Sequence, residues 1–348
     1  MSLVLPNFYQ PTNAEVWGYN PDIQALAGVA EQYRQDNKIL PAAGDRRRIE
    51  LLLIDLQGDF TYPEGTLYVG GRSGRGAIED IQRVAEFIYR NLDVITNITT
   101  TLDTHFAFQI FFPWFWQNAA GNSPAAHTII TTEDIRKGVY TPNPAVAGLL
   151  VGGNYQWLLK QVAFYVAELE RAGKYQLYLW PPHTLLGSVG HVLNGVIHEA
   201  RMFHALTRFS QSGSEIKGGN ALTENYSVLR PEVLMRWDGE PLDQKNTRFI
   251  ESLLENDYVV IGGEAASHCV SSSIDDLLGE ILAKDPALAA KVYILADCMS
   301  AVVVPDGNGG FLADFTPQAE AALERFRQAG MHVVKSTDPI TSWPDFRL

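Results

Sequence analysis

The sequence predicts a three-layer α/β/α protein built on a parallel sheet of about six strands. Short runs of aliphatic and β-branched residues alternate with segments whose apolar residues recur at helical spacing. Several of these runs also end in a residue that can carry chemistry. We assign the strands to residues 49–56, 94–102, 175–180, 258–261, 292–297 and 331–335. Helical periodicity covers 23–33, 78–88, 155–171, 188–206, the segment from 270 onward and 317–329.

Composition excludes several classes of partner. The chain has 348 residues and a net charge of −13, so we expect neither nucleic acid nor an anionic membrane as a partner. No apolar run is long enough to span a bilayer, and the N-terminus lacks a basic start followed by an apolar core. Two cysteines, Cys269 and Cys298, cannot form a disulfide framework, which favours a cytoplasmic location.

The chain divides into an N-terminal extension, residues 1–48, and one domain, residues 49–348, with a long insertion at about 106–174. The extension is expected to wrap around the domain or a neighbouring subunit. The insertion is rich in Pro, Gly, Asn and Thr, and so long a segment is usually functional or part of an interface. Its aromatic cluster, 111–116, would form a lid or an oligomer interface if exposed, and we expect a homo-oligomer.

Cys269 follows a buried strand and a small-residue turn and stands where a helix is expected to begin. Unpaired N–H groups and the helix dipole at such a position stabilise a thiolate, so Cys269 is a candidate nucleophile. The alternative is a cysteine that serves as a small buried apolar residue. Cys298 has no turn or helix start directly behind it, which favours a structural role.

Other strand ends carry Asp55, then Asp103 with His105, and then His183. Because the carboxyl ends of parallel strands share one edge of a sheet, these side chains can converge. One carboxylate and two imidazoles form a plausible ligand set for a divalent metal, although an exposed Asp-x-His is often only a solvated strand end.

Asp55 and Lys217 each have a structural and a functional interpretation. Asp55 is either a turn residue or a base that takes the proton of a cysteine thiol. Lys217 is either a surface lysine or, if it lies near Cys269, a cation that lowers the thiol pKa and pairs with Asp55.

Taken in order, these motifs resemble the nicotinamidase branch of the isochorismatase-like cysteine hydrolases. The resemblance rests on six motifs and extends from residue 49 to about 335, interrupted by the insertion. The motifs are Asp55, Asp103-x-His105, Trp180-Pro-Pro-His183, Lys217-Gly, Asn225-Tyr-Ser227 and Gly263-x-Ala-x-x-x-Cys269-Val.

The resemblance implies a hydrolase that converts nicotinamide to nicotinic acid and ammonia through a thioester. It implies a divalent metal, zinc first and iron or manganese otherwise, and a cis peptide bond between Glu264 and Ala265. The implied roles are a catalytic triad of Asp55, Lys217 and Cys269; metal ligands Asp103, His105 and His183; ring-flanking residues Phe60 and Trp180; and an oxyanion hole formed by the backbone N–H groups of Ala265 and Cys269.

The chain also departs from the family pattern. Gln109 stands where the family often has histidine, Thr184 replaces a cysteine, and Ala266-Ser267 replaces Thr-Asp. The long insertion begins beside the metal motif. Two alternatives therefore remain: another isochorismatase-like cysteine hydrolase acting on a different amide or ureido compound, and a catalytically silent binding protein on this fold.

Overall fold

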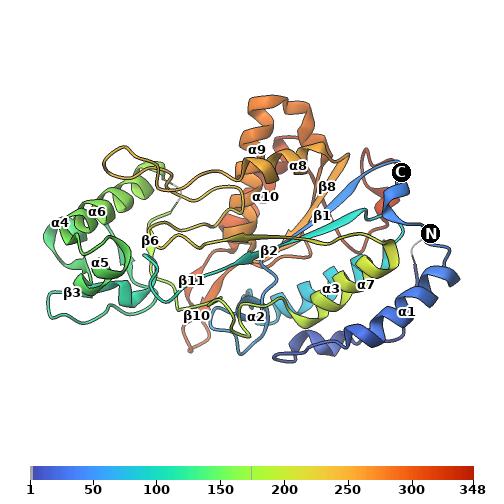
Figure 1. Ribbon diagram of the computed structural model, residues 1–348, viewed down its shortest axis with the longest axis horizontal. Coiled ribbons are helices and arrows are strands. Elements are labelled where there is room, and N and C mark those ends of the chain that lie inside the picture. Colours follow the sequence, from blue (N-terminus) through green and yellow to red (C-terminus); the bar gives the residue numbers. More distant parts are fainter. Residues whose placement is uncertain (1–2, 174) are drawn as a thin grey trace.

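The computed structural model describes residues 3–173 and 175–348. Its centre is a parallel six-stranded sheet with the strand order β12-β9-β8-β1-β2-β7, which crosses the molecule in Figure 1. The predicted α/β/α class is confirmed. The strands are β1 (Ile49–Ile54), β2 (Asn97–Asp103), β7 (Gly213–Lys217), β8 (Tyr258–Gly263), β9 (Val292–Leu295) and β12 (His332–Val334).

One predicted strand of the sheet is wrong. Residues 175–180 contribute only β6 (Leu177–Tyr178), which pairs antiparallel with β4 (Ile129–Ile130) outside the central sheet. The sixth position belongs to β7, which lies at the sheet edge beside β2. The sequence Gly213-Ser-Glu-Ile-Lys217 has no clear alternation or β-branched run, so pairing with β2 rather than local preference makes it a strand.

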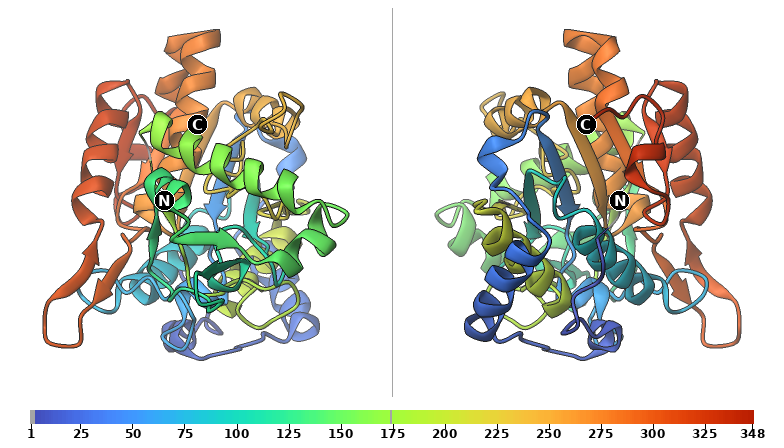
Figure 2. Two further views of the ribbon diagram at one scale, coloured as in Figure 1. Left: turned by 90° about the vertical axis from the view of Figure 1, so that its left-hand side faces the viewer. Right: turned by 90° about the vertical axis from the view of Figure 1, so that its right-hand side faces the viewer.

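Helices cover both faces of the sheet. On one face lie α1, α3 and α7, and on the other α8, α9 and α10, as Figures 1 and 2 show. The long helices are α1 (Ile23–Asp36), α3 (Gly76–Arg90), α7 (Gly195–Arg208), α8 (Thr247–Glu255), α9 (Ser271–Lys284) and α10 (Thr316–Gln328). In α3, Ile78, Ile81, Val84, Ala85 and Ile88 are all buried, as their spacing predicts.

The N-terminal segment packs on the body of the protein. Its helix α1 contacts α7, and its side chains Leu26 and Ala30 are buried in the same core as α3 and α7. Met1 and Ser2, which belong to the predicted extension, lie outside the described residues. Among the residues described, no helix is long and apolar enough to cross a bilayer.

The insertion folds instead of forming an irregular loop. It contains α4 (Thr132–Lys137), α5 (Pro144–Leu150) and α6 (Tyr155–Ala172), and a two-stranded sheet of β3 (Trp116–Asn118) and β5 (Tyr140–Pro142). Phe111, Phe112, Phe115 and Trp116 are fully buried and form a core, whereas Trp114 of the same cluster is exposed. The homo-oligomer stays a prediction. Lys174, the predicted end of the insertion, lies outside the described residues.

Two smaller elements complete the fold. The short helix α2 (Gly58–Thr61) follows β1. A hairpin of β10 (Val303–Pro305) and β11 (Phe311–Asp314) extends from the body of the protein at the lower edge of Figure 2.

Candidate active site

Asp55 follows the last residue of β1 and is fully buried. Its φ of 48° lies in the left-handed region, which non-glycine residues rarely adopt. The Thr101 side chain on the neighbouring strand holds this conformation: its hydroxyl oxygen accepts a hydrogen bond from the Asp55 N–H at 3.0 Å, and the hydroxyl donates to Asp55 Oδ1. The carboxyl group is therefore fixed before any substrate arrives.

Lys217 ends β7 and joins the predicted catalytic residues. Its Nζ lies 3.0 Å from Asp55 Oδ2, 2.9 Å from Asp103 Oδ1 and 3.6 Å from Cys269 Sγ. It also donates a hydrogen bond to the Asn225 carbonyl oxygen at 2.8 Å. Burial opposes the charge, but Asp103 and Asp55 hold the pKa of Lys217 well above its usual value.

The position after Lys217, which Gly218 occupies, has room only for glycine. Its φ is +84°, and a Cβ at this position would lie 2.7 Å from the His105 ring and 2.8 Å from Asp103 Oδ1. A side chain would therefore displace two of the predicted metal ligands.

Cys269 lies in a π-helical turn, Ala266–Val270, and α9 begins only at Ser271. The expected lowering of the thiol pKa is wrong in its net direction. Burial raises the pKa of Cys269 well above its usual value, and the charge of Lys217 opposes this rise. The cysteine is thus placed beside its predicted partners as a protonated thiol.

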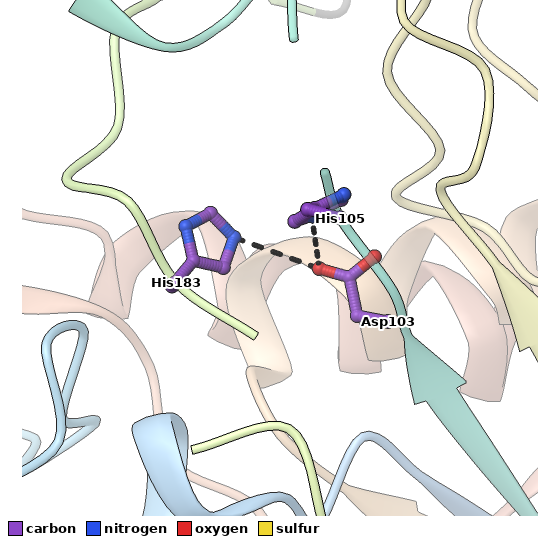
Figure 3. Close-up of side chains that lie close together, drawn as sticks. All are labelled: Asp103, His105 and His183. Atoms are coloured by element: carbon purple, nitrogen blue, oxygen red, sulfur yellow. Dashed lines mark hydrogen bonds and ion pairs between the residues drawn. The ribbon is translucent and has the colours of Figure 1, made fainter. Parts of the chain in front are cut away.

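Asp103, His105 and His183 converge as predicted, as Figure 3 shows. Asp103 Oδ2 lies 2.8 Å from His105 Nε2 and 3.5 Å from His183 Nε2. Asp103 is the last residue of β2 and His105 lies just beyond it, whereas His183 comes from the loop after β6 and not from a strand of the sheet.

The hydrogen bonds of the two imidazoles indicate which nitrogen of each ring faces the Asp103 carboxylate. His183 Nδ1 donates to the Pro181 carbonyl oxygen at 2.7 Å, and His105 Nδ1 donates to the Gly218 carbonyl oxygen at 3.2 Å. Because Nδ1 carries the proton that it donates, Nε2 is the ring nitrogen that can bind a metal, and in both rings it faces the Asp103 carboxylate. Three electron-pair donors that meet in this way fit a divalent cation.

A pocket of about 430 Å³, its mouth included, is lined by Cys269 of the predicted triad and by all three predicted metal ligands. Its walls include both predicted ring-flanking residues, Phe60 and Trp180. The peptide bond between Glu264 and Ala265 is cis, as expected. The other lining residues are Leu67, Val69, Asp103, His105, His183, Glu224, Asn225, Tyr226, Ala265, His268, Cys269 and Val302.

Among solved structures, the chain is similar to yeast nicotinamidase bound to the inhibitor nicotinaldehyde, with 18% identity and a TM-score of 0.50. The match covers 82% of this chain and 99% of the yeast protein. The chain has the fold of the nicotinamidases. The resemblance seen in the sequence is thereby confirmed at the level of the fold.

Two further matches have the same extent. A nicotinamidase and pyrazinamidase from Acinetobacter baumanii shares 17% identity at a TM-score of 0.49, over 84% of this chain and 99% of that protein. A pyrazinamidase of Pyrococcus horikoshii in complex with zinc shares 17% identity at a TM-score of 0.43, over 83% and 99%. No protein-family model and no curated protein sequence matches the chain.

On this nicotinamidase fold, Gln109 contacts one of the predicted metal ligands. It stands where the family often has histidine, and its Nε2 donates to the Gly218 carbonyl oxygen at 2.8 Å and lies 3.3 Å from His105 Nδ1. Gln109 therefore helps to orient the His105 ring and the loop after Lys217.

The sequence patterns did not indicate three residues of the site. Thr101 holds Asp55, and Gln57 holds Asp103 through both of its backbone groups: Nε2 donates to the Asp103 carbonyl oxygen at 2.8 Å, and Oε1 accepts from the Asp103 N–H at 2.7 Å. Glu224 brings a buried carboxyl group to the pocket wall. The position of Gln57 two residues after Asp55 was the only available signal.

Proposed function

We propose that the protein is a metal-containing cysteine amidohydrolase that converts nicotinamide to nicotinic acid and ammonia. The position of Lys217 is the observation that carries this proposal. Its single ammonium group contacts Asp55 and Asp103 and lies 3.6 Å from the Cys269 sulfur. A nucleophile, a base and a predicted metal ligand therefore surround one buried cation, and two of them, Cys269 and Asp103, line one small pocket.

In the acylation step, the Cys269 sulfur attacks the carboxamide carbon while the thiol proton passes to Asp55. Burial raises the pKa of Asp55, and Lys217 opposes this rise, so the carboxylate is a stronger base than an exposed aspartate. Asp55 then gives the proton to the departing amide nitrogen. The carbon–nitrogen bond breaks, ammonia leaves and a thioester to Cys269 remains.

The negative charge on the carbonyl oxygen needs donors at this stage. We assign this role to the backbone N–H groups of Ala265 and Cys269, because both residues line the pocket. In the second half of the reaction, Asp55 takes a proton from water as the water oxygen attacks the thioester. The carbon–sulfur bond breaks, nicotinic acid is released and the thiol is restored.

Asp103, His105 and His183 would hold the divalent metal, with zinc the first expectation and iron or manganese the others. A metal bound there would supply a Lewis acid that orients a ring nitrogen or polarises a bound water. Phe60 and Trp180 would hold an aromatic ring between them. Trp180 is fixed for this by the hydrogen bond that its Nε1 donates to the Tyr226 hydroxyl at 3.0 Å.

The test is release of ammonia and nicotinic acid from nicotinamide by the purified, metal-loaded protein. We expect turnover by the wild type and by Cys298→Ala, which removes the other buried cysteine, and none by Cys269→Ala. Absence of turnover by the metal-loaded wild type would refute nicotinamide as the substrate. A wild type that hydrolyses no amide at all would favour a silent binding protein.

Glu224 favours a second candidate, a related carboxamide with an amino or hydroxyl substituent. Burial raises the pKa of Glu224 well above its usual value, and the neighbouring Tyr226 side chain opposes this rise. The insertion supports its position, because the Tyr165 hydroxyl accepts a hydrogen bond from the Glu224 N–H at 3.1 Å. The ratio of kcat/KM for hydroxybenzamides to that for nicotinamide, compared between wild type and Glu224→Gln, distinguishes the two candidates.

A further inference from the structure

Arg201 on α7 is a partly buried cation with no acidic partner. Its Nη1 donates to Thr100 Oγ1 at 2.8 Å and to Ser214 Oγ at 2.9 Å. Within residues 3–173 and 175–348, Arg201 forms no ion pair, and its Nε is buried without a hydrogen-bond partner. This guanidinium group has no carboxylate partner among the described residues, although the chain has 40 acidic residues and a net charge of −13.

The nearest acid along the helix is already engaged. Glu199 accepts hydrogen bonds from the hydroxyl groups of Tyr19 at 2.6 Å and Tyr89 at 3.2 Å. Burial alone accounts for the lowered pKa of Arg201, with no carboxylate raising it. Among the described residues, no carboxylate therefore neutralises this cation, and an anion that enters from solvent would do so.

Arg201 lines a cavity of about 980 Å³, its mouth included. His198, one turn earlier on the same face of α7, lines it as well, and so does Ser214 on β7. Its walls also carry apolar side chains, and no Asp or Glu is among the described lining residues. The apolar side chains are Pro21, Leu102, Val189, Val192 and Leu193.

The cavity is separate from the candidate active site. Successive residues of β2 point to opposite faces of the sheet. Thr101 and Asp103 point toward Asp55 and the metal ligands, whereas Thr100 and Leu102 point toward α7 and the cavity. Among the described residues, the linings of the two pockets have no residue in common.

We propose that this cavity binds a small organic carboxylate, held by the Nη2 group of Arg201. The hydrogen bonds to Thr100 and Ser214 use Nη1, and Nη2 has no hydrogen-bond partner among the described residues. The N–H groups of Nη2 can donate charge-assisted hydrogen bonds to the oxygens of a carboxylate. The apolar walls of Leu102 and Val192 suit a ligand with an apolar body.

The charge in the cavity favours a monoanion over phosphate. Burial, and secondarily the charge of Arg201, lower the pKa of His198, and burial also lowers the pKa of His191, so both imidazoles of the cavity are neutral near pH 7. One guanidinium charge then matches one carboxylate. A phosphate dianion would keep a second negative charge without a cation and would face apolar walls.

Calorimetric titration of the full-length, metal-loaded protein with benzoate near neutral pH tests this site. We expect benzoate to bind to the wild type and to bind at least about tenfold more weakly to Arg201→Gln. Arg201→Lys keeps the charge but loses the planar group that Thr100 and Ser214 hold in place, and we expect it to bind weakly too. Arg248→Gln, which changes an exposed arginine paired with Glu215 at 2.7 Å, is the matched control and should bind as the wild type.

Two measurements separate this site from the active site. Binding that depends on Arg201 should persist in His183→Ala, which removes a predicted metal ligand, and thermal unfolding should confirm that each variant is folded. Equal affinity in wild type and Arg201→Gln, tighter binding of inorganic phosphate than of benzoate, or no binding up to about 10 mM would each overturn the proposal. Because no turnover is measured, failure of the nicotinamidase assignment would not affect the result.

Discussion

The cations on the two faces of β2, Lys217 and Arg201, have different kinds of partner. On the active-site face, the carboxyl groups of Asp55 and Asp103 both lie within 3.0 Å of Lys217 Nζ. On the α7 face, the hydrogen-bond partners of Arg201 among the described residues are only the hydroxyl groups of Thr100 and Ser214. The strand therefore lies between a network in which each carboxyl group meets a cation and a cation that has no acidic partner among the described residues.

The difference matches the two proposed roles, a catalytic network and a binding site. A network in which each carboxyl group meets a cation keeps its geometry without a ligand, as a nucleophile and its base require. An uncompensated cation instead gains from an anion that enters. Four experiments test whether this distinction holds.

Lys217→Met is expected to have the largest effect. It leaves two buried carboxyl groups without their cation, which should lower the free energy of unfolding by about 3–5 kcal/mol and abolish turnover. Arg201→Gln should lower it by no more than about 1 kcal/mol, because the glutamine amide can still donate to Thr100 or Ser214. Urea unfolding of both variants measures the contrast. Equal losses would mean that the two cations play equivalent structural roles.

Asp55→Asn removes the proton acceptor and keeps the shape of the side chain. Loss of general base catalysis should lower kcat for nicotinamide by about 10²–10⁴-fold, while circular dichroism reports an unchanged fold. A variant that retains turnover within about threefold of the wild type would remove Asp55 from the mechanism.

We expect a further positive charge on the α7 side of the sheet to lower the stability of the protein, and protonation of His204 tests this expectation. Its imidazole is fully buried with Nε2 donating to the Ile95 carbonyl oxygen, and burial lowers its pKa from 6.5 to about 4. A lowered folded-state pKa gives stability that is complete above pH 6.5 and is lost as the pH falls toward 4. By pH 5 the loss attributable to His204 should be about 2 kcal/mol.

Urea unfolding at pH 7 and pH 5 measures this loss. His204→Gln keeps a donor for the Ile95 carbonyl oxygen but does not titrate in this range, so its stability should fall less over the same interval. If the two proteins lose stability equally between pH 7 and pH 5, another group is responsible.

The smallest effects come from two neighbouring threonines on opposite faces. Thr101→Val removes the hydroxyl group that both accepts from and donates to Asp55, which should cost about 1–2 kcal/mol of stability and reduce kcat. Thr100→Val removes one acceptor of Arg201 and should lower both the stability and kcat by less. Unfolding and turnover assays of the pair measure the contrast. A larger loss of kcat in Thr100→Val would contradict the separation of the two faces.

Much of the fold could be predicted because its signals are local. Apolar runs at β1, β2, β8 and β9 and helical periodicity in α3 and α6 are properties of a few neighbouring residues. The edge strand β7 was missed and residues 175–180 were wrongly included, because membership of a sheet edge depends on the pairing partner. The order within the insertion was missed for a similar reason: its short elements are held by a shared aromatic core.

The candidate site likewise contains residues that local sequence signals predict and residues that they do not. Strand ends and motif order brought together Asp55, Asp103, His105, Lys217 and Cys269, all of which the structure places in contact or close to one another. The residues that orient them, Thr101 and Gln57, carry no signal of their own. A hydroxyl or an amide becomes a support only through the partner that it meets in space.

The sequence by itself determined the fold class, the reactive residues and the edge of the sheet at which they gather, because strand ends and residue types can be read along the chain. Only the tertiary structure decided the direction in which the Cys269 pKa moves, the strand that carries Lys217 to it, and the absence of an acidic partner for Arg201 among the described residues. Each of these depends on burial and on distances between segments remote in sequence, which set the cost of a charge and which no local pattern contains.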